Sequence, residues 1–168
     1  LQIPGDPRQH YLPHLEWMPD GKHLALQQFN RLQTTNRVFV VNPTTGVVRS
    51  AMEETDAAWL ENLNPFRWTG TAGDFVWLSE RDGWRHAYLA HAGGQPPSRI
   101  TEGNFDVIEV ESVDSKEGWL YYTASPENFT QCYLYRTRLS GGAPERVSPK
   151  GQPGWHAYDI APDCQWAV

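Results

Sequence analysis

Residues 75–94 read "FVWLSERDGWRHAYLAHAGG", and this stretch predicts the local fold of the chain. Its first six residues alternate between two faces, as the side chains of a β-strand do. Asp82 and Gly83 then supply a tight turn, because Gly tolerates a positive φ and Asp can hydrogen-bond to its own backbone. Residues 85–90 return as the partner strand, so the stretch is predicted to form a β-hairpin.

The same hairpin recurs along the chain at a constant spacing. The turn glycines Gly46, Gly94 and Gly142 follow one another at intervals of 48 residues. Each glycine is preceded by a turn, an apolar strand, a polar connection and a second apolar strand, in that order. A fourth unit begins with "PDCQWAV" at residues 162–168.

Repeats of about 40 to 50 residues with several strands each indicate a β-propeller. One small twisted sheet cannot bury both of its faces, whereas blades stacked around an axis cover one another. The innermost strand of each blade is expected before the turn, and the outermost after the glycine. We therefore predict an all-β fragment of a propeller with about three and a half four-stranded blades, at approximately residues 10–54, 64–102, 104–149 and 154–168.

The composition agrees with many short strands and argues against several classes of function. The 168 residues include 12% aromatic residues, 13 Pro and 14 Gly, which favours strands and turns over long helices. The net charge of -6 and the absence of a basic run give nucleic-acid binding little support. No segment approaches the roughly 20 apolar residues of a membrane span. The chain begins at Leu1, and we expect it to be a piece of a longer protein.

The ordered set of motifs resembles one known family. "FVWLSERDGWRHAYL" is similar to the hairpin signature in the N-terminal β-propeller of the dipeptidyl peptidase IV family, which are prolyl oligopeptidase-type serine peptidases. The connection Asn30-Arg31-Leu32-Gln33, the passage "EETDAAWLE" and the segment "GWLYYTASPENFTQCYLYRTRL" resemble other parts of that propeller in the same order. The resemblance covers residues 11–163.

This resemblance implies that the parent protein removes dipeptides from peptide N-termini, with Pro or Ala as the second residue. In the family, the propeller forms one wall of the substrate chamber, and a C-terminal α/β-hydrolase domain carries Ser, Asp and His. No serine of this chain lies in a G-x-S-x-G elbow, so we expect no catalytic residue here and the hydrolase domain to lie outside residues 1–168. The implied partners are peptides, and the implied location is periplasmic or extracellular. The alternative is a non-enzymatic propeller that serves as a scaffold or binds ligands.

The loop after Trp59 is the candidate for the substrate chamber. In the family, the equivalent loop reaches toward the chamber and contributes an aromatic or a basic residue. Here the next positions are Glu61, Asn62 and Leu63, which offer neither, although Leu63 could line an apolar wall. The alternative is a plain connector that follows the outer strand, with at most one helical turn.

Glu53 and Glu54 are a second candidate, because the family binds the substrate's ammonium group with two adjacent glutamates. However, the passage around them resembles the exit of an outer strand, so we expect a solvated strand face instead. His10 and His14 stand four residues apart, which on a strand separates them by roughly 13 Å, too far for one zinc ion. We expect neither a metal nor a cofactor.

The remaining notable residues have structural interpretations. Cys132 and Cys164 could form a disulfide in an oxidising compartment, but buried free thiols are favoured. The polar tip of the opening hairpin, residues 80–82, is interpreted as solvated. Strand-borne tryptophans are expected to pack between blades, with a carbohydrate platform as the alternative: Trp17, Trp68, Trp77 and Trp119. Unpaired sheet edges near His10 and residue 155 predict that the isolated fragment associates with itself.

Overall fold

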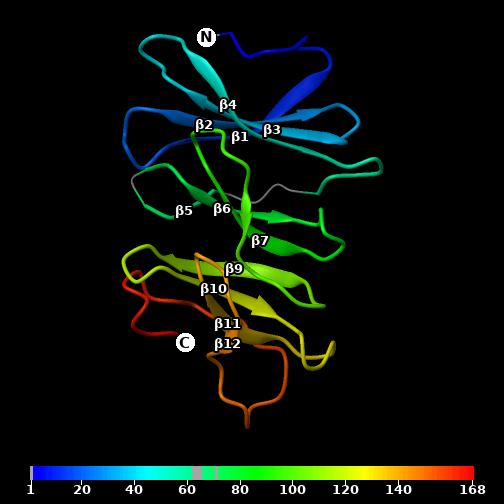
Figure 1. The fold of residues 1–168 in the computed structure, drawn as a ribbon, viewed down its shortest axis with the longest axis vertical. Coiled ribbons are helices and arrows are strands. Elements are labelled where there is room, and N and C mark those ends of the chain that lie inside the picture. Colours follow the sequence, from blue (N-terminus) through cyan, green and yellow to red (C-terminus); the bar gives the residue numbers. More distant parts are fainter. Residues whose placement is uncertain (1, 62–65, 71) are drawn as a thin grey trace. The chain divides into compact units, whose positions relative to one another are not determined.

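The computed structural model describes residues 2–61, 66–70 and 72–168, and all regular structure in them is β (Figure 1). Twelve strands form three four-stranded sheets, with the orders β1-β2-β3-β4, β5-β6-β7-β8 and β12-β11-β10-β9. Within each sheet, each strand therefore hydrogen-bonds to the next one along the chain. This order confirms the predicted repeat of four-stranded units, and it explains why the local turn signals were informative.

The first sheet contains β1 (His10–Trp17), β2 (Leu24–Asn30), β3 (Thr35–Val41) and β4 (Val48–Thr55). Period-2 alternation places Leu26 opposite Phe39, and both side chains are buried on one face. Val41 joins this cluster, and Ile3 from the preceding segment packs against it. The apolar residues of β2 and β3 thus form the core of this sheet.

The middle sheet contains β5 (Arg67–Trp68), β6 (Phe75–Ser79), β7 (His86–Ala90) and β8 (Ser98–Arg99). The hairpin predicted from residues 75–94 is confirmed. Gly83 has a φ of +89°, and its N–H donates a hydrogen bond of 2.8 Å to the carbonyl of Glu80. All five residues of β6 are buried, so both faces of this strand are covered.

The third sheet contains β9 (Val107–Asp114), β10 (Trp119–Ala124), β11 (Tyr133–Arg138) and β12 (Glu145–Arg146). Among the described residues 147–168, two isolated bridges replace the strand that was expected there. They join Cys132 to Trp155 and Ile160 to Ala167. The outer strands β8 and β12 are each only two residues long, shorter than their sequence patterns suggest.

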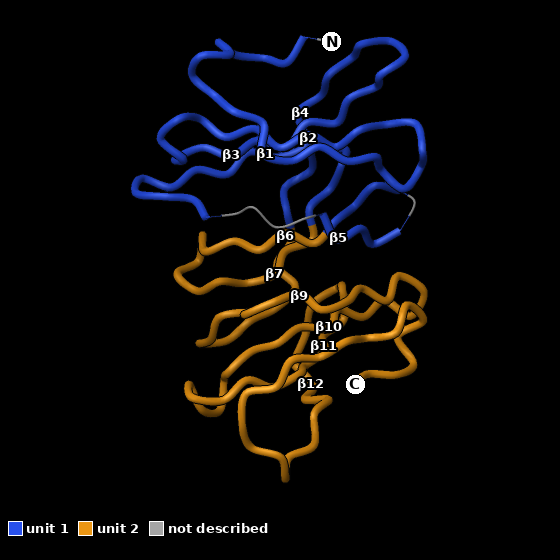
Figure 2. The backbone as a smooth tube through the Cα atoms, turned by 180° about the vertical axis from the view of Figure 1, so that it is seen from behind, with its two compact units in different colours: residues 1–75, 90–97 blue, residues 76–89, 98–168 orange. Residues whose placement is uncertain are grey.

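Contacts divide the chain into two compact units, residues 1–75 with 90–97 and residues 76–89 with 98–168 (Figure 2). In the first unit, the rings of Phe66 and Trp68 both contact Phe75, with centroid distances of 5.0 and 5.6 Å. The core of the second unit joins residues of β6 and β7 to the third sheet: Val76, Leu78, Ala87, Ile100, Phe105, Val107, Val110, Leu120, Tyr122, Ala124, Tyr133 and Tyr135.

The tryptophans and cysteines occupy different environments. Trp77 is buried as expected for packing, whereas the same expectation is wrong for Trp17, which lies on the edge strand β1 and is 60% exposed. The Trp119 ring stacks with the guanidinium groups of Arg136 and Arg138, at 4.2 and 3.5 Å from its centroid. Both cysteines are free thiols.

Candidate functional site

The β4-exit loop, residues 56–61, carries the described part of the predicted chamber site. Asp56 begins it with an Asx turn, in which its Oδ1 accepts hydrogen bonds from the N–H groups of Ala58 (2.7 Å) and Trp59 (3.1 Å). These two donors lower the pKa of the Asp56 carboxyl group, since they favour its charged form. The helical turn that was considered for this segment is therefore replaced by a side-chain-capped turn.

Backbone hydrogen bonds hold this loop against the turn between β2 and β3. The N–H of Asp56 donates to the carbonyl of Thr34 (3.0 Å), and the N–H of Leu60 donates to the carbonyl of Gln33 (2.7 Å). Two segments that resemble family motifs, the connection at residues 30–33 and the passage at residues 53–61, thus lie side by side.

The connection itself is shaped by two polar side chains. The Oδ1 of Asn30 accepts hydrogen bonds from the N–H groups of Thr34 and Thr35, at 2.9 and 3.0 Å. Gln33 adopts a positive φ of 52°, and its side-chain amide donates to the hydroxyl of Tyr11. These contacts give Asn30 and Gln33 a structural role in placing the loop, which the sequence pattern alone did not reveal.

Trp59 provides the large exposed aromatic side chain of the β4-exit loop. It is 56% exposed, and Glu61 is exposed as well. Asn62 and Leu63, the other two candidates, lie outside the described residues. A half-exposed indole on a loop held by hydrogen bonds at both ends offers a flat apolar surface in a defined position.

Glu53 and Glu54 lie on opposite faces of β4. Glu53 is exposed and forms an ion pair with Arg37, with 2.5 Å between Nε and Oε2, whereas Glu54 is only 6% exposed. The expectation of a solvated face is confirmed for Glu53 and wrong for Glu54, which is opposite the buried Asn36. Because neighbouring strand residues point apart, this geometry does not bring the two carboxylates together on one ammonium group.

The inner strands of the first unit contain a polar contact that sequence reasoning missed. Glu16 on β1 accepts a hydrogen bond of 2.6 Å from the indole Nε1 of Trp68 on β5, and its other oxygen lies 2.6 Å from Nε2 of His14. The ring of Phe66 packs against the His14 imidazole, 5.5 Å away. The only sequence signal is that residues 14 and 16, two apart on a strand, share a face.

His14 is thus engaged by the carboxylate of Glu16. Among the described residues, no group of three or more His, Cys, Asp and Glu side chains could hold a metal ion. In that same part of the chain, no helix is long and apolar enough to span a membrane.

Residues 80–82 at the tip of the opening hairpin are exposed, as expected, and Arg81 and Asp82 also contact neighbouring strands. The hydroxyl of Tyr88 donates to the carboxylate of Asp82, and Arg99 lies 3.5 Å from the same carboxylate. The Arg81 guanidinium stacks on the Tyr88 ring, 4.8 Å from its centroid. Burial and the hydrogen bond to Asp82 raise the pKa of Tyr88, because both disfavour the phenolate.

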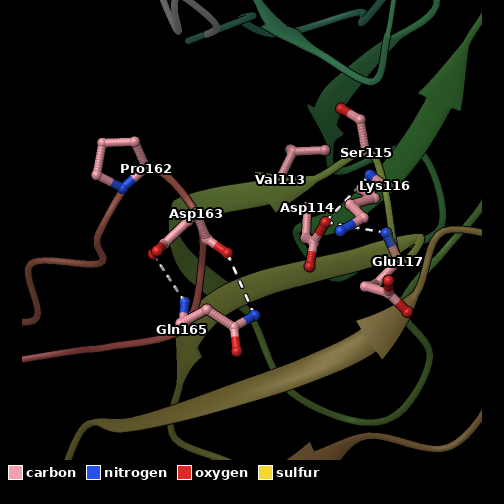
Figure 3. A pocket seen from close by; sticks show the side chains of 8 residues that line it. All are labelled: Val113, Asp114, Ser115, Lys116, Glu117, Pro162, Asp163 and Gln165. Atoms are coloured by element: carbon pink, nitrogen blue, oxygen red, sulfur yellow. Dashed lines mark hydrogen bonds between the residues drawn. The ribbon is translucent and has the colours of Figure 1, made fainter.

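A hollow of about 450 Å³ lies at the turn between β9 and β10 (Figure 3). Two of its carboxylates accept local hydrogen bonds: Asp114 from the N–H groups of Lys116 and Glu117, and Asp163 from that of Gln165. Eight residues line the hollow: Val113, Asp114, Ser115, Lys116, Glu117, Pro162, Asp163 and Gln165. We assign it no function.

The fold defines the class of the protein. Three successive four-stranded sheets, each with its strands in chain order, are blades of a β-propeller. The crystal structure of Porphyromonas gingivalis dipeptidyl peptidase 4 contains the same fold, with a TM-score of 0.90 and 23% identity over the whole of this chain and 23% of that one.

The family follows from the sequence match. The model of the dipeptidyl peptidase IV (DPP IV) N-terminal region matches residues 1–168, and the chain belongs to this family. A probable dipeptidyl peptidase 4 of Emericella nidulans is 32% identical over 77% of this chain and 18% of its own length. Dipeptidyl peptidase 4 of Arthroderma otae is 29% identical over 71% of this chain and 16% of its own length. The chain thus spans about a fifth of the relatives that it matches.

Proposed function

We propose that this chain forms part of the wall of a substrate chamber in a serine exopeptidase. The parent enzyme removes dipeptides from peptide N-termini, with Pro or Ala as the second residue. The observation that carries the proposal is the family match over residues 1–168. In this division of labour, the nucleophile lies in an α/β-hydrolase domain outside the chain, in keeping with the lack of a G-x-S-x-G serine in residues 1–168.

Within this role, the β4-exit loop shapes the chamber and controls access to it. The hydrogen bonds at Asp56 and Leu60 restrict the loop, so the Trp59 ring can contact a peptide without a large loss of conformational freedom. An indole face suits the flat apolar ring of proline. Peptides are therefore the proposed partners of this surface.

The test is hydrolysis of a chromogenic Gly-Pro or Ala-Pro amide by the full-length protein, with residues 1–168 alone as the control. Turnover by the full-length protein and none by the chain alone is the expected result. No turnover by either would reject the peptidase and favour the non-enzymatic scaffold. Turnover by the chain alone would refute the division of labour.

We further propose that the parent protein acts in the periplasm or outside the cell. This location rests on the family resemblance. The two cysteines give no argument for or against it, because a disulfide would have indicated an oxidising compartment and neither cysteine forms one. Fractionation of the source cells, followed by detection of the full-length protein, tests it. Recovery in the cytosolic fraction alone would reject the proposal.

A further inference from the structure

His86, at the start of β7, is almost completely buried, with 1% of its surface exposed. Its Nε2 lies 3.1 Å from the carbonyl oxygen of Gly103, and its Nδ1 lies 3.1 Å from Oγ1 of Thr101. Phe105 packs edge-on against the imidazole, with the centroids 5.8 Å apart. All three partners belong to residues 100–107, which we call the first crossover because they lead from β8 to β9.

The hydrogen bonds specify the neutral imidazole. A carbonyl only accepts, so Nε2 must carry the proton that is donated to Gly103. Thr101 Oγ1 already accepts a hydrogen bond of 2.9 Å from the N–H of Ala87, so its own hydrogen is free to be donated to Nδ1. Every polar atom in the contact is then satisfied. A proton on Nδ1 would face the threonine oxygen and displace that hydrogen bond.

The surrounding charges do not compensate for a buried imidazolium. Burial lowers the pKa of His86 below its ordinary value of 6.5, and the positive charge of Arg99 on β8 lowers it further. Three groups act in the opposite direction: the carbonyl of Gly103, Asp82 from the β6–β7 turn and Asp106 from the first crossover. Asp82 is also used by Tyr88 and Arg99, and Asp106 accepts a hydrogen bond of 2.7 Å from the N–H of Arg85.

The third sheet contains the same crossover without a histidine at its centre. The N–H groups of Ile100 and Thr101 donate to the carbonyl of Ala87, and those of Val147 and Ser148 donate in the same way to the carbonyl of Leu134. The residue that precedes Leu134 therefore corresponds to His86. That residue is Tyr133.

Tyr133 is held by a guanidinium group, and no imidazole takes part in the contact. The guanidinium of Arg146 covers its ring at 3.5 Å, and Arg146 Nε donates to the carbonyl of Ser148 at 3.2 Å. Neither Tyr nor Arg changes its charge between about pH 5 and pH 8. Residues 147–155, the second crossover, are thus an internal control for the first.

We propose that His86 is an acid-sensitive latch, which holds the first crossover on β7 while its imidazole is neutral and releases it on protonation. β9 begins at Val107, whose N–H donates to the carbonyl of Arg85 at 2.7 Å, so release loosens the start of the inner strand of the third sheet. The latch itself does not depend on the proposed function. Only an effect of the latch on peptide turnover would rest on that function.

The sign of the effect follows from linkage. Because the pKa of folded His86 is lowered, the released state binds the proton more readily, and the closed state is favoured fully above about pH 6.5. The free-energy preference for the closed state over the released state declines as the pH falls from about 6.5 to the pKa of the latched imidazole. The opening equilibrium then rises by up to about tenfold for each unit by which the pKa is lowered.

Amide hydrogen exchange of the full-length protein tests the latch, with protection factors corrected for the intrinsic pH dependence of exchange. Between about pH 7.5 and pH 5, we expect protection at Val107 and Thr101 to fall several-fold. Ser148, which matches Thr101, and Cys132, whose N–H donates to the carbonyl of Gly154 in the second crossover, should keep their protection. An equal fall at both crossovers, or no fall at either, would overturn the proposal.

Two kinds of variant separate titration from packing. His86→Gln keeps a donor for Gly103 but cannot be protonated, so the pH dependence at the first crossover should disappear. Thr101→Val removes the hydroxyl that favours the neutral ring and should raise the pH midpoint, whereas Thr101→Ser should leave it unchanged. If His86→Gln does not fold, the two threonine variants still test the latch. Equal pH midpoints for Thr101→Val and Thr101→Ser would reject it. Peptide turnover measured in parallel reports on the proposed function independently.

Discussion

Gly94, in the turn between β7 and β8, lies directly against the backbone of β4. A Cβ atom at this position would come within 3.3 Å of the carbonyl oxygen of Ser50, and the residue has a φ of +85°. The relationship is repeated in the second unit, where a Cβ at Gly141 would lie 3.4 Å from the carbonyl oxygen of Arg99, again with a positive φ. Gly94 and Gly141 therefore serve both their own turns and the close approach of the outer strand from the preceding sheet, whereas a Cβ at Gly46 or Gly142 would meet no atom within 4 Å.

Gly94→Ala should destabilise the protein more than Gly46→Ala does. Gly46 has a similar φ of +74°, but a Cβ there would meet no atom within 4 Å. Both substitutions cost about 1 to 2 kcal/mol for a left-handed backbone, and only Gly94→Ala adds the close contact with a carbonyl, worth about 1 kcal/mol more. Urea unfolding of the two variants measures the difference. Equal losses would show that the contact with Ser50 is not tight.

The outer hairpin of the third sheet is held by a second repeated arrangement. Tyr135 is opposite Arg146, as Tyr88 is opposite Arg99, and the hydroxyl of Tyr135 donates a 3.1 Å hydrogen bond to Glu127. Glu127 also pairs with Arg146 at 3.0 Å. Both hairpins thus join a tyrosine, a carboxylate from the preceding turn and an arginine from the outer strand.

Tyr135→Phe should lower the free energy of unfolding by about 1 kcal/mol, the usual contribution of one hydrogen bond. Glu127→Ala should cost at least a similar amount, and the double variant should cost less than the sum, because both single substitutions remove the Tyr135–Glu127 hydrogen bond. Urea unfolding of the three variants gives the coupling energy. Strict additivity would mean that Tyr135 and Glu127 do not interact in solution.

The repeat, the hairpins and the order of the strands could be predicted because they depend on local signals. Alternation over a few residues and a glycine at each turn are visible in the sequence. The interval of 48 residues between the turn glycines identifies the hairpins as repeats of one unit. The two-residue lengths of β8 and β12 were not visible, because they depend on pairing with β7 and β11.

The polar contacts of the candidate site could not be predicted for a different reason. The pairing of β3 with β4 shifts register between Val38 and Phe39, which changes the face on which the later residues of β4 lie. Glu54 consequently joins buried residues although its neighbour Glu53 is exposed. The bond from Trp68 to Glu16 spans 52 positions, and no local pattern specifies such a pair.

Trp59→Ala should weaken peptide hydrolysis by the full-length protein. If the indole forms part of the chamber wall, its loss should reduce kcat/KM for an Ala-Pro amide by about threefold to tenfold, chiefly through KM. Phe129→Ala is the matched control, because Phe129 is 78% exposed on the turn between β10 and β11, away from the β4-exit loop in sequence. Initial rates over a range of substrate concentrations separate KM from kcat. Wild-type values for Trp59→Ala would remove this residue from the proposed chamber.

Residues 1–168 alone should associate through their open sheet edges. β1, eight residues long, is at the edge of the first sheet and pairs with β2, and β9 is at the edge of the third. Such edges present unpaired N–H and C=O groups, and on β1 the side chains of Leu15 and Trp17 are 57% and 60% exposed beside them. Sedimentation velocity should therefore show dimers or larger species.

Lysine at both positions, Leu15→Lys with Trp17→Lys, should reduce association, because charged residues discourage pairing at an edge. Leu32→Lys, in the exposed turn between β2 and β3, should leave it unchanged, and a monodisperse monomer of the unaltered chain would refute the prediction.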